Sequence, residues 1–177
     1  IVQDGAEVLR EKAKPVPENL FGTPELAKLI ADMAEALDAF PEGVALAAPQ
    51  IGIGYRLFIV RKDRAVTPAP TSGPTLDVGT PTDNVGEVVA TSAKSAEVEV
   101  YVNPEIVKTS RKRAKADEGC LSVHGVYGTT NRHERATIKA RRPDGSHMQC
   151  GASGLLAQIF EHEIDHLNGI LFTDHAE

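Results

Sequence analysis

Two histidines near the end of the chain stand four residues apart, with two acidic residues between them, in the segment His162-Glu163-Ile164-Asp165-His166. On a helix, side chains four residues apart project from one face about one turn apart, so both imidazoles can reach one metal ion. Glu163, next to the first histidine, can take a proton from a water at that metal. Leaving these polar side chains unpaired in an apolar helix would be costly, so the pattern favours a metal site over a purely structural role.

A third metal ligand has to come from elsewhere in the chain. One class of metalloproteases continues the pattern as His-x-x-Gly-x-x-His, but here the last position is Phe172, which cannot bind a metal. Asp174 and His175 follow in the tail, and spacing alone does not exclude them. Cys120 is the better candidate, because a thiolate is a good metal ligand and the preceding Gly119 lets the backbone approach closely.

An apolar loop rich in small residues, 43–52, carries a single amide side chain, that of Gln50. Small residues allow a substrate backbone to lie close to the loop, and an amide N–H can donate to a developing oxyanion. The alternative is a tightly packed loop between a helix and a strand, with no role in chemistry.

The composition places this chemistry in a folded, acidic chain. With 177 residues, 41% of them hydrophobic and 25% charged, the chain can bury a core, and its length favours one domain over 1–177 rather than two. The 19 Lys and Arg against 25 Asp and Glu give a net charge of -6, so we expect no direct binding to nucleic acid. No run of about eighteen apolar residues occurs, so no membrane association is expected. Two cysteines make no disulfide framework, which predicts a cytoplasmic protein, or an organellar one if a transit peptide has been removed.

Two helices are predicted to position the polar residues. Apolar residues at helical spacing predict a helix between the N-cap Thr23 and Phe40. A second helix is expected to begin near Ser153 and to end at Asn168-Gly169. Because this second helix is apolar on much of its circumference and carries both histidines, we expect it to lie inside the domain.

Short strands are predicted from alternating or continuous apolar patterns, with a turn at 143–145 between the last two. The segment 63–97 is rich in Pro, Thr and Gly, and is predicted to be a surface insertion with a hairpin near 88–91. The predicted strands are 56–60, 97–102, 105–108, 136–140 and 147–150.

Three separated segments together resemble the signatures of the peptide deformylase family. These signatures are a Gly-x-Gly-x-Ala-Ala-x-Gln loop, a Glu-Gly-Cys-Leu-Ser segment and a His-Glu-x-Asp-His helix, and the chain carries them in this order at 43–50, 118–122 and 162–166. The similarity extends to Val8-Leu9-Arg10 and Val102-Asn103-Pro104-Glu105, and so covers nearly the whole chain. It implies an α+β fold in which antiparallel sheets pack around a central C-terminal helix that carries the metal ligands.

The resemblance also implies an activity. The enzyme would be a metal-dependent hydrolase that removes the formyl group from N-formylmethionyl peptides on ribosome-associated nascent chains and releases formate. Cys120, His162 and His166 would bind one divalent metal, ferrous iron in the native enzyme, with zinc, nickel or cobalt as alternatives. Glu163 would act as the general base.

Further residues are implied on the substrate side. The Gln50 side chain and the backbone N–H of Leu121 would hold the oxyanion. The peptide backbone would add as a strand beside the protein. The residues implied to contact it are Gly43, Val44, Ala45, Gly119 and Arg132.

Two departures from the family pattern keep alternatives open. Ala45 stands where the family usually has its second Gly, and Glu161 stands where it usually has Gln. A catalytically weak relative that binds peptide or metal is one alternative, and the general His-Glu-x-x-His pattern leaves a zincin-type metallopeptidase as another. Asp165 is expected to be structural, pairing with an Arg or holding a ligand histidine.

Overall fold

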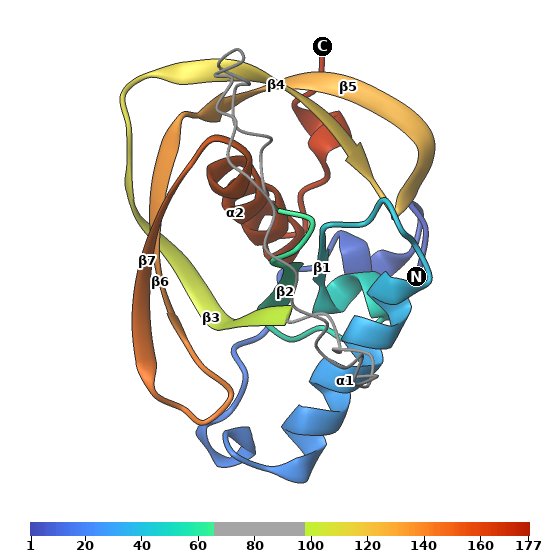
Figure 1. The fold of residues 1–177 in the computed structure, drawn as a ribbon. Helices are drawn as coiled ribbons and strands as arrows, with labels where there is room; N and C mark the ends of the chain where they lie inside the picture. The colour runs from blue at the N-terminus through green and yellow to red at the C-terminus, as the bar shows by residue number, and fades with distance from the viewer. Residues whose placement is uncertain (66–97) are drawn as a thin grey trace, which may run out of the picture.

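The computed structural model describes residues 1–65 and 98–177, which form an α+β fold with two antiparallel sheets. Helix α2 runs through the middle of the fold, with the large sheet curving around it from β6 and β7 on the left to β1 on the right, and with the small sheet across one end (Figure 1). The helices are α1 (Pro24–Asp38) and α2 (Gly154–Leu167), with 3₁₀ turns η1 (Glu7–Leu9), η2 (Glu18–Leu20), η3 (Ala48–Ile51) and η4 (Phe172–Asp174). In the order β1-β2-β3-β6-β7, the larger sheet contains β1 (Ala45–Ala47), β2 (Leu57–Arg61), β3 (Val98–Thr109), β6 (Arg135–Arg141) and β7 (His147–Ser153). The smaller sheet pairs β4 (Arg113–Cys120) with β5 (Val123–His133).

Both predicted helices are confirmed. Thr23 caps α1, and its side-chain oxygen accepts a hydrogen bond from the backbone N–H of Leu26 at 3.3 Å. Helix α2 begins directly after Ser153, as expected, although the Ser153 side chain makes no capping hydrogen bond. Gly169 follows the end of α2 with φ 76°, the left-handed conformation that ends a helix.

Strand β2 explains why α2 is central, because all five residues of β2 are buried. Phe58 belongs to the core cluster that includes Phe160 of α2. Leu57 and Ile59, on the opposite face of the strand, belong to a second cluster that includes Met33 of α1. The two helices therefore cover opposite faces of one strand, and α2 lies in the interior.

Four strands differ from the sequence prediction. Strand β1 lies inside the segment expected to be a loop, and β4 and β5 were not predicted at all. The small sheet leaves much of its surface to solvent, and its exposed residues include Arg113 and Lys115, so no hydrophobic alternation marks it. The strands expected at 97–102 and 105–108 form one strand, β3, with an irregular register next to Asn103, whose φ is 50°.

Strands β6 and β7 match the last two predictions, and the turn at 143–145 connects them. Nearly all of the predicted insertion, including its hairpin at 88–91, falls on residues 66–97 and lies outside the described residues. Neither α1 nor α2, nor any shorter helix in the described ranges, has the length and apolarity needed to cross a bilayer.

Candidate metal centre

Three side chains from two distant parts of the chain converge beside α2. The ligand-capable atoms of Cys120, His162 and His166 all lie within 4.8 Å of one another. Cys120 Sγ is 3.2 Å from His166 Nε2, and the two imidazole rings meet edge to face with centroids 4.9 Å apart. Cys120 is the last residue of β4, so the pairing of β4 with β5 carries the sulfur to the face of α2.

The donor set fits a divalent metal. A sulfur and two imidazole nitrogens at this spacing match the three-protein-ligand sites of catalytic metals, with a position left for water or substrate. Two buried polar atoms nearby, Glu163 Oε2 and His166 Nδ1, have no hydrogen-bond partner within the described part of the chain. Buried polar atoms without partners are rare, so Glu163 Oε2, on a residue that lines the cavity, also points to a bound group at this site. His166 Nδ1 lies on the side of the ring away from Cys120 Sγ and carries no such indication.

The two tail residues that spacing left open as ligands lie elsewhere. Asp174 pairs with Arg10 at 2.7 Å and accepts the backbone N–H of Leu171. His175 is half exposed, with its Nε2 4.0 Å from Asp165 Oδ2. The structure therefore brings Cys120, rather than either tail residue, to the two histidines.

A buried charge network lies behind His162. Glu118 Oε2 lies 3.1 Å from His162 Nδ1, which leaves Nε2 of that ring for the metal. Arg132 donates to both oxygens of Glu118, at 2.7 and 3.0 Å, and to Asp165 Oδ2 at 2.6 Å. Burial opposes ionisation of Glu118, but its hydrogen bonds with His162 and Arg132 lower its pKa to about 2.

This network changes the expectation for Arg132. Its guanidinium is buried against Glu118 and Asp165, and Arg132 does not line the cavity at the metal site. The structure therefore places Arg132 where it supports the carboxylate that holds a ligand histidine, and its contact with a substrate backbone stays a prediction. Asp165 pairs with an Arg, as expected.

Burial shifts the protonation of the site residues. It raises the pKa of Glu163 to about 7. Burial also lowers the pKa of His166 well below its ordinary value. For His162 burial acts in the same direction, but hydrogen bonds to Cys120 and Glu118 outweigh it and raise the pKa to about 10 in the metal-free protein.

A cavity of about 590 Å³ opens onto the metal centre between β1 and β4. Within the described ranges β1 pairs only with β2, and β4 only with β5, so each strand presents one unpaired edge. A Cβ at Gly119 would lie 2.8 Å from the Tyr127 ring, so a larger residue there would require this exposed ring to move. Of the residues expected at the site, those lining the cavity are Gly43, Val44, Ala45, Gln50, Gly119, Cys120, Leu121, His162 and Glu163.

The amide of Gln50 is held in one orientation. Gln50 is buried, and its Oε1 accepts the backbone N–H of Ala47 at 2.9 Å. Its Nε2 therefore faces the metal centre, where it donates to Ser122 Oγ at 3.2 Å and to Cys120 Sγ at 3.5 Å. Ser122 lies inside the recognised Glu-Gly-Cys-Leu-Ser segment, but its own contribution was not foreseen.

The charge of Glu161, which departs from the family pattern, has a local partner. Glu161 Oε1 contacts Nδ1 of His133, and Oε2 accepts the backbone N–H of His133 at 3.3 Å. Arg113 Nε lies 3.1 Å from the other nitrogen of this ring. Glu161 is therefore bound at the end of β5 and is not left facing the ligand His162.

Comparison with known proteins identifies the family. Residues 1–177 match the family "Polypeptide deformylase". A peptide deformylase of Carboxydothermus hydrogenoformans is 38% identical over 177 residues, which is all of this chain and 92% of that protein. A peptide deformylase of Symbiobacterium thermophilum is 39% identical over 174 residues, 98% of this chain, and the match spans 64% of that protein's length.

A solved structure gives the same answer. The Met-Ala-Ser-bound class I type b peptide deformylase of Acinetobacter baumannii superposes with a TM-score of 0.75 at 31% identity, covering 99% of this chain and 97% of that one. The fold class expected from the sequence is confirmed by this likeness and by the antiparallel sheets around α2. The match over the whole chain, these relatives and the Cys-His-His metal site together show that the chain belongs to the peptide deformylase family of metallohydrolases.

Proposed function

We propose that this deformylase removes the formyl group from N-formylmethionyl peptides, with Glu163 transferring the proton and with Gln50 and the Leu121 N–H holding the oxyanion. One observation carries the proposal. Cys120 and His162 of the metal-ligand trio, the buried carboxylate of Glu163 and two unpaired strand edges all face one cavity. The relative solved with Met-Ala-Ser supports a methionyl peptide as the ligand class.

A divalent metal held by Cys120, His162 and His166 supplies Lewis acidity, which activates water and polarises the formyl carbonyl. We propose ferrous iron as the native metal. Nitrogen and sulfur ligands together suit iron, zinc, nickel and cobalt, so the ligand set supports all four. Metal analysis of protein purified without oxygen tests the choice, and zinc as the predominant metal in such protein would contradict it.

Glu163 is proposed as the group that moves the proton. Its buried carboxylate has a pKa raised to about 7, so near neutral pH it can both accept and release a proton. Glu163 takes a proton from the attacking water while the water oxygen bonds to the formyl carbon. It then gives this proton to the amine nitrogen as the C–N bond breaks, and the products are formate and a peptide with a free amino terminus.

The oxyanion is proposed to lie between two donors. Gln50 Nε2 already points to the sulfur side of the cavity, because the carbonyl of the same amide is fixed on the Ala47 N–H. The backbone N–H of Leu121, the next residue after Cys120, is the second donor, and Leu121 lines the cavity. Donors fixed in place before the reaction stabilise developing charge most effectively.

The peptide backbone is proposed to enter as an added strand between β1 and β4. The unpaired edges of these strands, at Val44–Ala45 and at Gly119, supply main-chain hydrogen bonds. Leu155 and Ile159 of α2 line the same cavity as Val44, and they provide an apolar surface for the methionine side chain.

Formate release from formyl-Met-Ala-Ser tests the function, beside an internal peptide substrate for the metallopeptidase alternative. The wild-type protein is expected to release formate and to leave the internal peptide uncleaved. Glu163→Ala is expected to keep one metal per chain and to lose activity by about 10²–10⁴-fold. Glu35→Ala, an exposed change on α1, is the control. Near-normal formate release by Glu163→Ala would refute the role of Glu163.

The catalytically weak alternative loses part of its support. One of its two reasons was the added charge of Glu161, and that carboxylate is bound to His133. One metal per chain without detectable formate release would restore this alternative.

Nascent chains on ribosomes are the proposed source of substrate, and the cytoplasm is the proposed compartment. The two free cysteines support a reducing environment. Cell fractionation followed by detection of the protein on ribosomes tests both statements, and its recovery from an organelle would overturn the second.

A further inference from the structure

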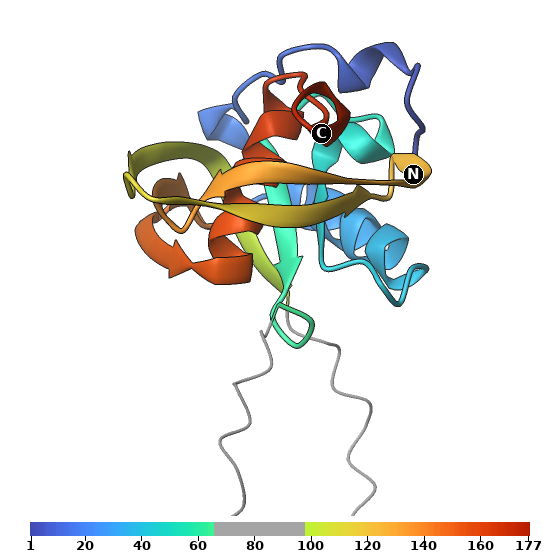
Figure 2. The same cartoon turned by 90° about the horizontal axis from the view of Figure 1, so that it is seen from above.

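The first residues of the chain connect the two segments that supply donors to the metal centre. The backbone N–H of Val2 donates to the carbonyl of Gln50 at 2.8 Å. The backbone N–H of Asp4 donates to the carbonyl of Ser122 at 2.7 Å. Residues 2–4, called here the N-terminal strap, therefore join the η3 segment to the turn between β4 and β5. The N-terminus lies beside that turn in both ribbon views (Figures 1 and 2).

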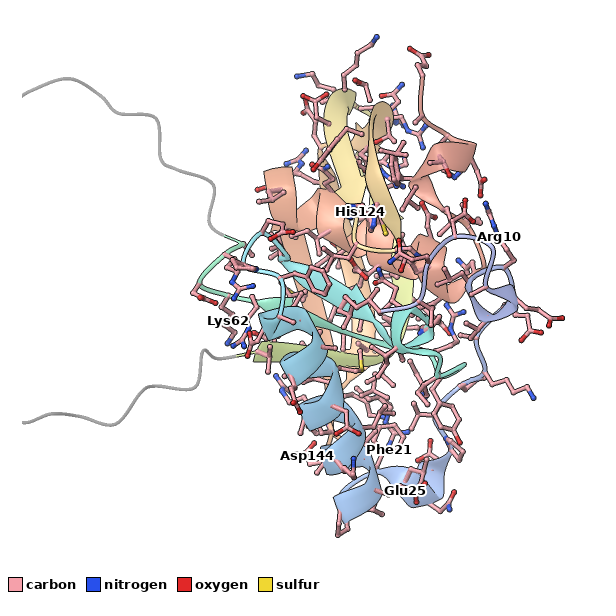
Figure 3. The ribbon with its side chains drawn as sticks, turned by 90° about the vertical axis from the view of Figure 1, so that its right-hand side faces the viewer. Arg10, Phe21, Glu25, Lys62, His124 and Asp144 are labelled. Atoms are coloured by element: carbon pink, nitrogen blue, oxygen red, sulfur yellow. The ribbon has the colours of Figure 1, made fainter. Side chains whose placement is uncertain are left out.

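Between these two anchors, the side chain of Gln3 binds the turn itself. Gln3 Nε2 donates to the carbonyl of Leu121 at 3.0 Å, and Gln3 Oε1 accepts the backbone N–H of His124 at 3.4 Å. His124, labelled in Figure 3, marks this turn. One exposed amide thus closes the turn from outside, with its donor and its acceptor both used.

The Leu121 carbonyl belongs to the same peptide group as the N–H of Ser122. That N–H points at the metal site, and it donates to Cys120 Sγ at 3.4 Å. A hydrogen bond accepted by a peptide oxygen polarises the group and strengthens the N–H as a donor. Gln3 therefore acts on the ligand sulfur through one peptide group, and the number and strength of N–H donors to a ligand sulfur tune the bound metal.

We propose that Gln3 is a positioning residue for the metal centre. By holding the peptide group between Leu121 and Ser122, it fixes the N–H···S bond to Cys120 and the neighbouring Leu121 N–H. The second part rests on the proposed function, because it assigns that N–H to the oxyanion. The first part concerns only the ligand sulfur and stands without it.

A purely structural role for Gln3 predicts different consequences. Its side chain is exposed and belongs to none of the apolar clusters, so removing it should cost little stability. If Gln3 merely anchored the N-terminus, its loss would change the melting temperature and leave the metal spectrum and kcat unchanged. If Gln3 positions the turn, its loss should change the metal spectrum and kcat and leave the melting temperature nearly unchanged.

The test compares Gln3→Ala and Gln3→Glu with wild type in cobalt-substituted protein. Both variants lose the donor to the Leu121 carbonyl, whereas the Glu side chain keeps its shape and an acceptor for the His124 N–H. Gln149→Ala is the matched control, because Gln149 is an exposed amide on β7 whose side chain makes no hydrogen bond to the described residues. The measurements are cobalt content, the sulfur-to-cobalt charge-transfer band, melting temperature, and kcat and KM for formyl-Met-Ala-Ser.

Both Gln3 variants are expected to bind one cobalt per chain with a shifted charge-transfer band. Their kcat should fall by about 3–10-fold, below the 10–100-fold typical of direct partners of metal ligands, while KM stays within about two-fold. The control is expected to match wild type in every measurement. A band and a kcat equal to wild type in Gln3→Ala would overturn the proposal.

The two parts can fail separately. A shifted band with unchanged kcat would overturn the effect on the oxyanion and support the effect on the sulfur. If the wild-type protein with one metal per chain released no formate, the proposed function would fall, but the band in the Gln3 variants would still decide whether Gln3 acts on Cys120.

Discussion

The two walls of the metal centre are built in different ways. On one wall, α2 presents His162, Glu163 and His166 from a single helical turn packed in the core. On the other wall, the turn after β4 and the η3 segment present Cys120 and Gln50, which lie 70 residues apart in sequence and meet through hydrogen bonds. The first wall depends on helical spacing, and the second depends on contacts between distant segments.

The side-chain positions on the two walls are therefore fixed by different interactions. A helix fixes the distance between its own side chains, so the core packing of α2 needs only to keep the helix in place. On the turn wall, no single helix fixes the distances between the side chains. Cys120 and Gln50 are held instead by the N-terminal strap, by the pairing of β4 with β5, and by the hydrogen bond of the Gln50 amide to Ala47. We therefore expect changes on the helix wall to abolish metal binding or chemistry, and changes on the turn wall, apart from the ligand Cys120 itself, to adjust rates.

The largest effect is expected from His166→Ala on the helix wall. It removes one of three protein ligands, and the remaining pair cannot hold a metal tightly. Metal content should fall from one per chain to below about a tenth, and formate release by more than about 10³-fold. Metal analysis after dialysis measures this, with His147→Ala on exposed β7 as the control. Full metal content in His166→Ala would show that His166 is not a ligand.

On the turn wall, Gln50→Ala should leave the metal in place and slow the reaction. Loss of one oxyanion donor is expected to lower kcat by about 10²–10³-fold. The contrast with His166→Ala is the test of the comparison, because only the helix-wall change should empty the site. A loss of metal in Gln50→Ala equal to that in His166→Ala would mean that the two walls do not differ in this way.

The same difference explains what the sequence could predict. Helical spacing allowed His162, Glu163 and His166 to be predicted as site residues. Thr23 and Gly169 correctly predicted where α1 begins and where α2 ends. The ligand Cys120 was only the best of several candidates until the family resemblance supported it. No local sequence pattern predicts that β4 ends at Cys120, or which residues contact the Cys120 sulfur.

Long-range contacts account for the misses. Strands β4 and β5 carry little apolar alternation because the small sheet is largely open to solvent, so the sequence did not predict them. The sequence also did not predict the contact of Arg132 with Glu118, which follows from the pairing of β5 with β4. The bonds of Gln3 to the turn join residues more than 100 positions apart, and no periodicity reports such pairs.

A smaller effect is expected from Glu118→Gln, which alters the hydrogen bond between β4 and the ligand His162 of α2. Glu118 lies on β4 and holds Nδ1 of His162 on α2. The amide keeps the shape but loses the charge that orients the imidazole and balances Arg132, so metal affinity should fall by about 10–100-fold. A competition titration with a chelator measures it, and Glu105→Gln on β3 is the exposed control. An unchanged affinity would make the charge of Glu118 irrelevant to the metal.

The smallest effect is expected from Glu161→Gln, which restores the residue usual in the family at the edge of the helix wall. Because the Glu161 carboxylate is bound by His133 on β5, its charge should have little influence on His162, and kcat should stay within about two-fold of wild type. Losing the contact with the His133 ring should lower the free energy of unfolding by about 1 kcal/mol, while the amide oxygen can still accept the His133 N–H. Denaturant unfolding and the formate assay measure the two quantities. A rise in kcat of more than about five-fold with no loss of stability would show that this carboxylate acts on the ligand histidine, so that tertiary contacts tune the helix wall as they do the turn wall.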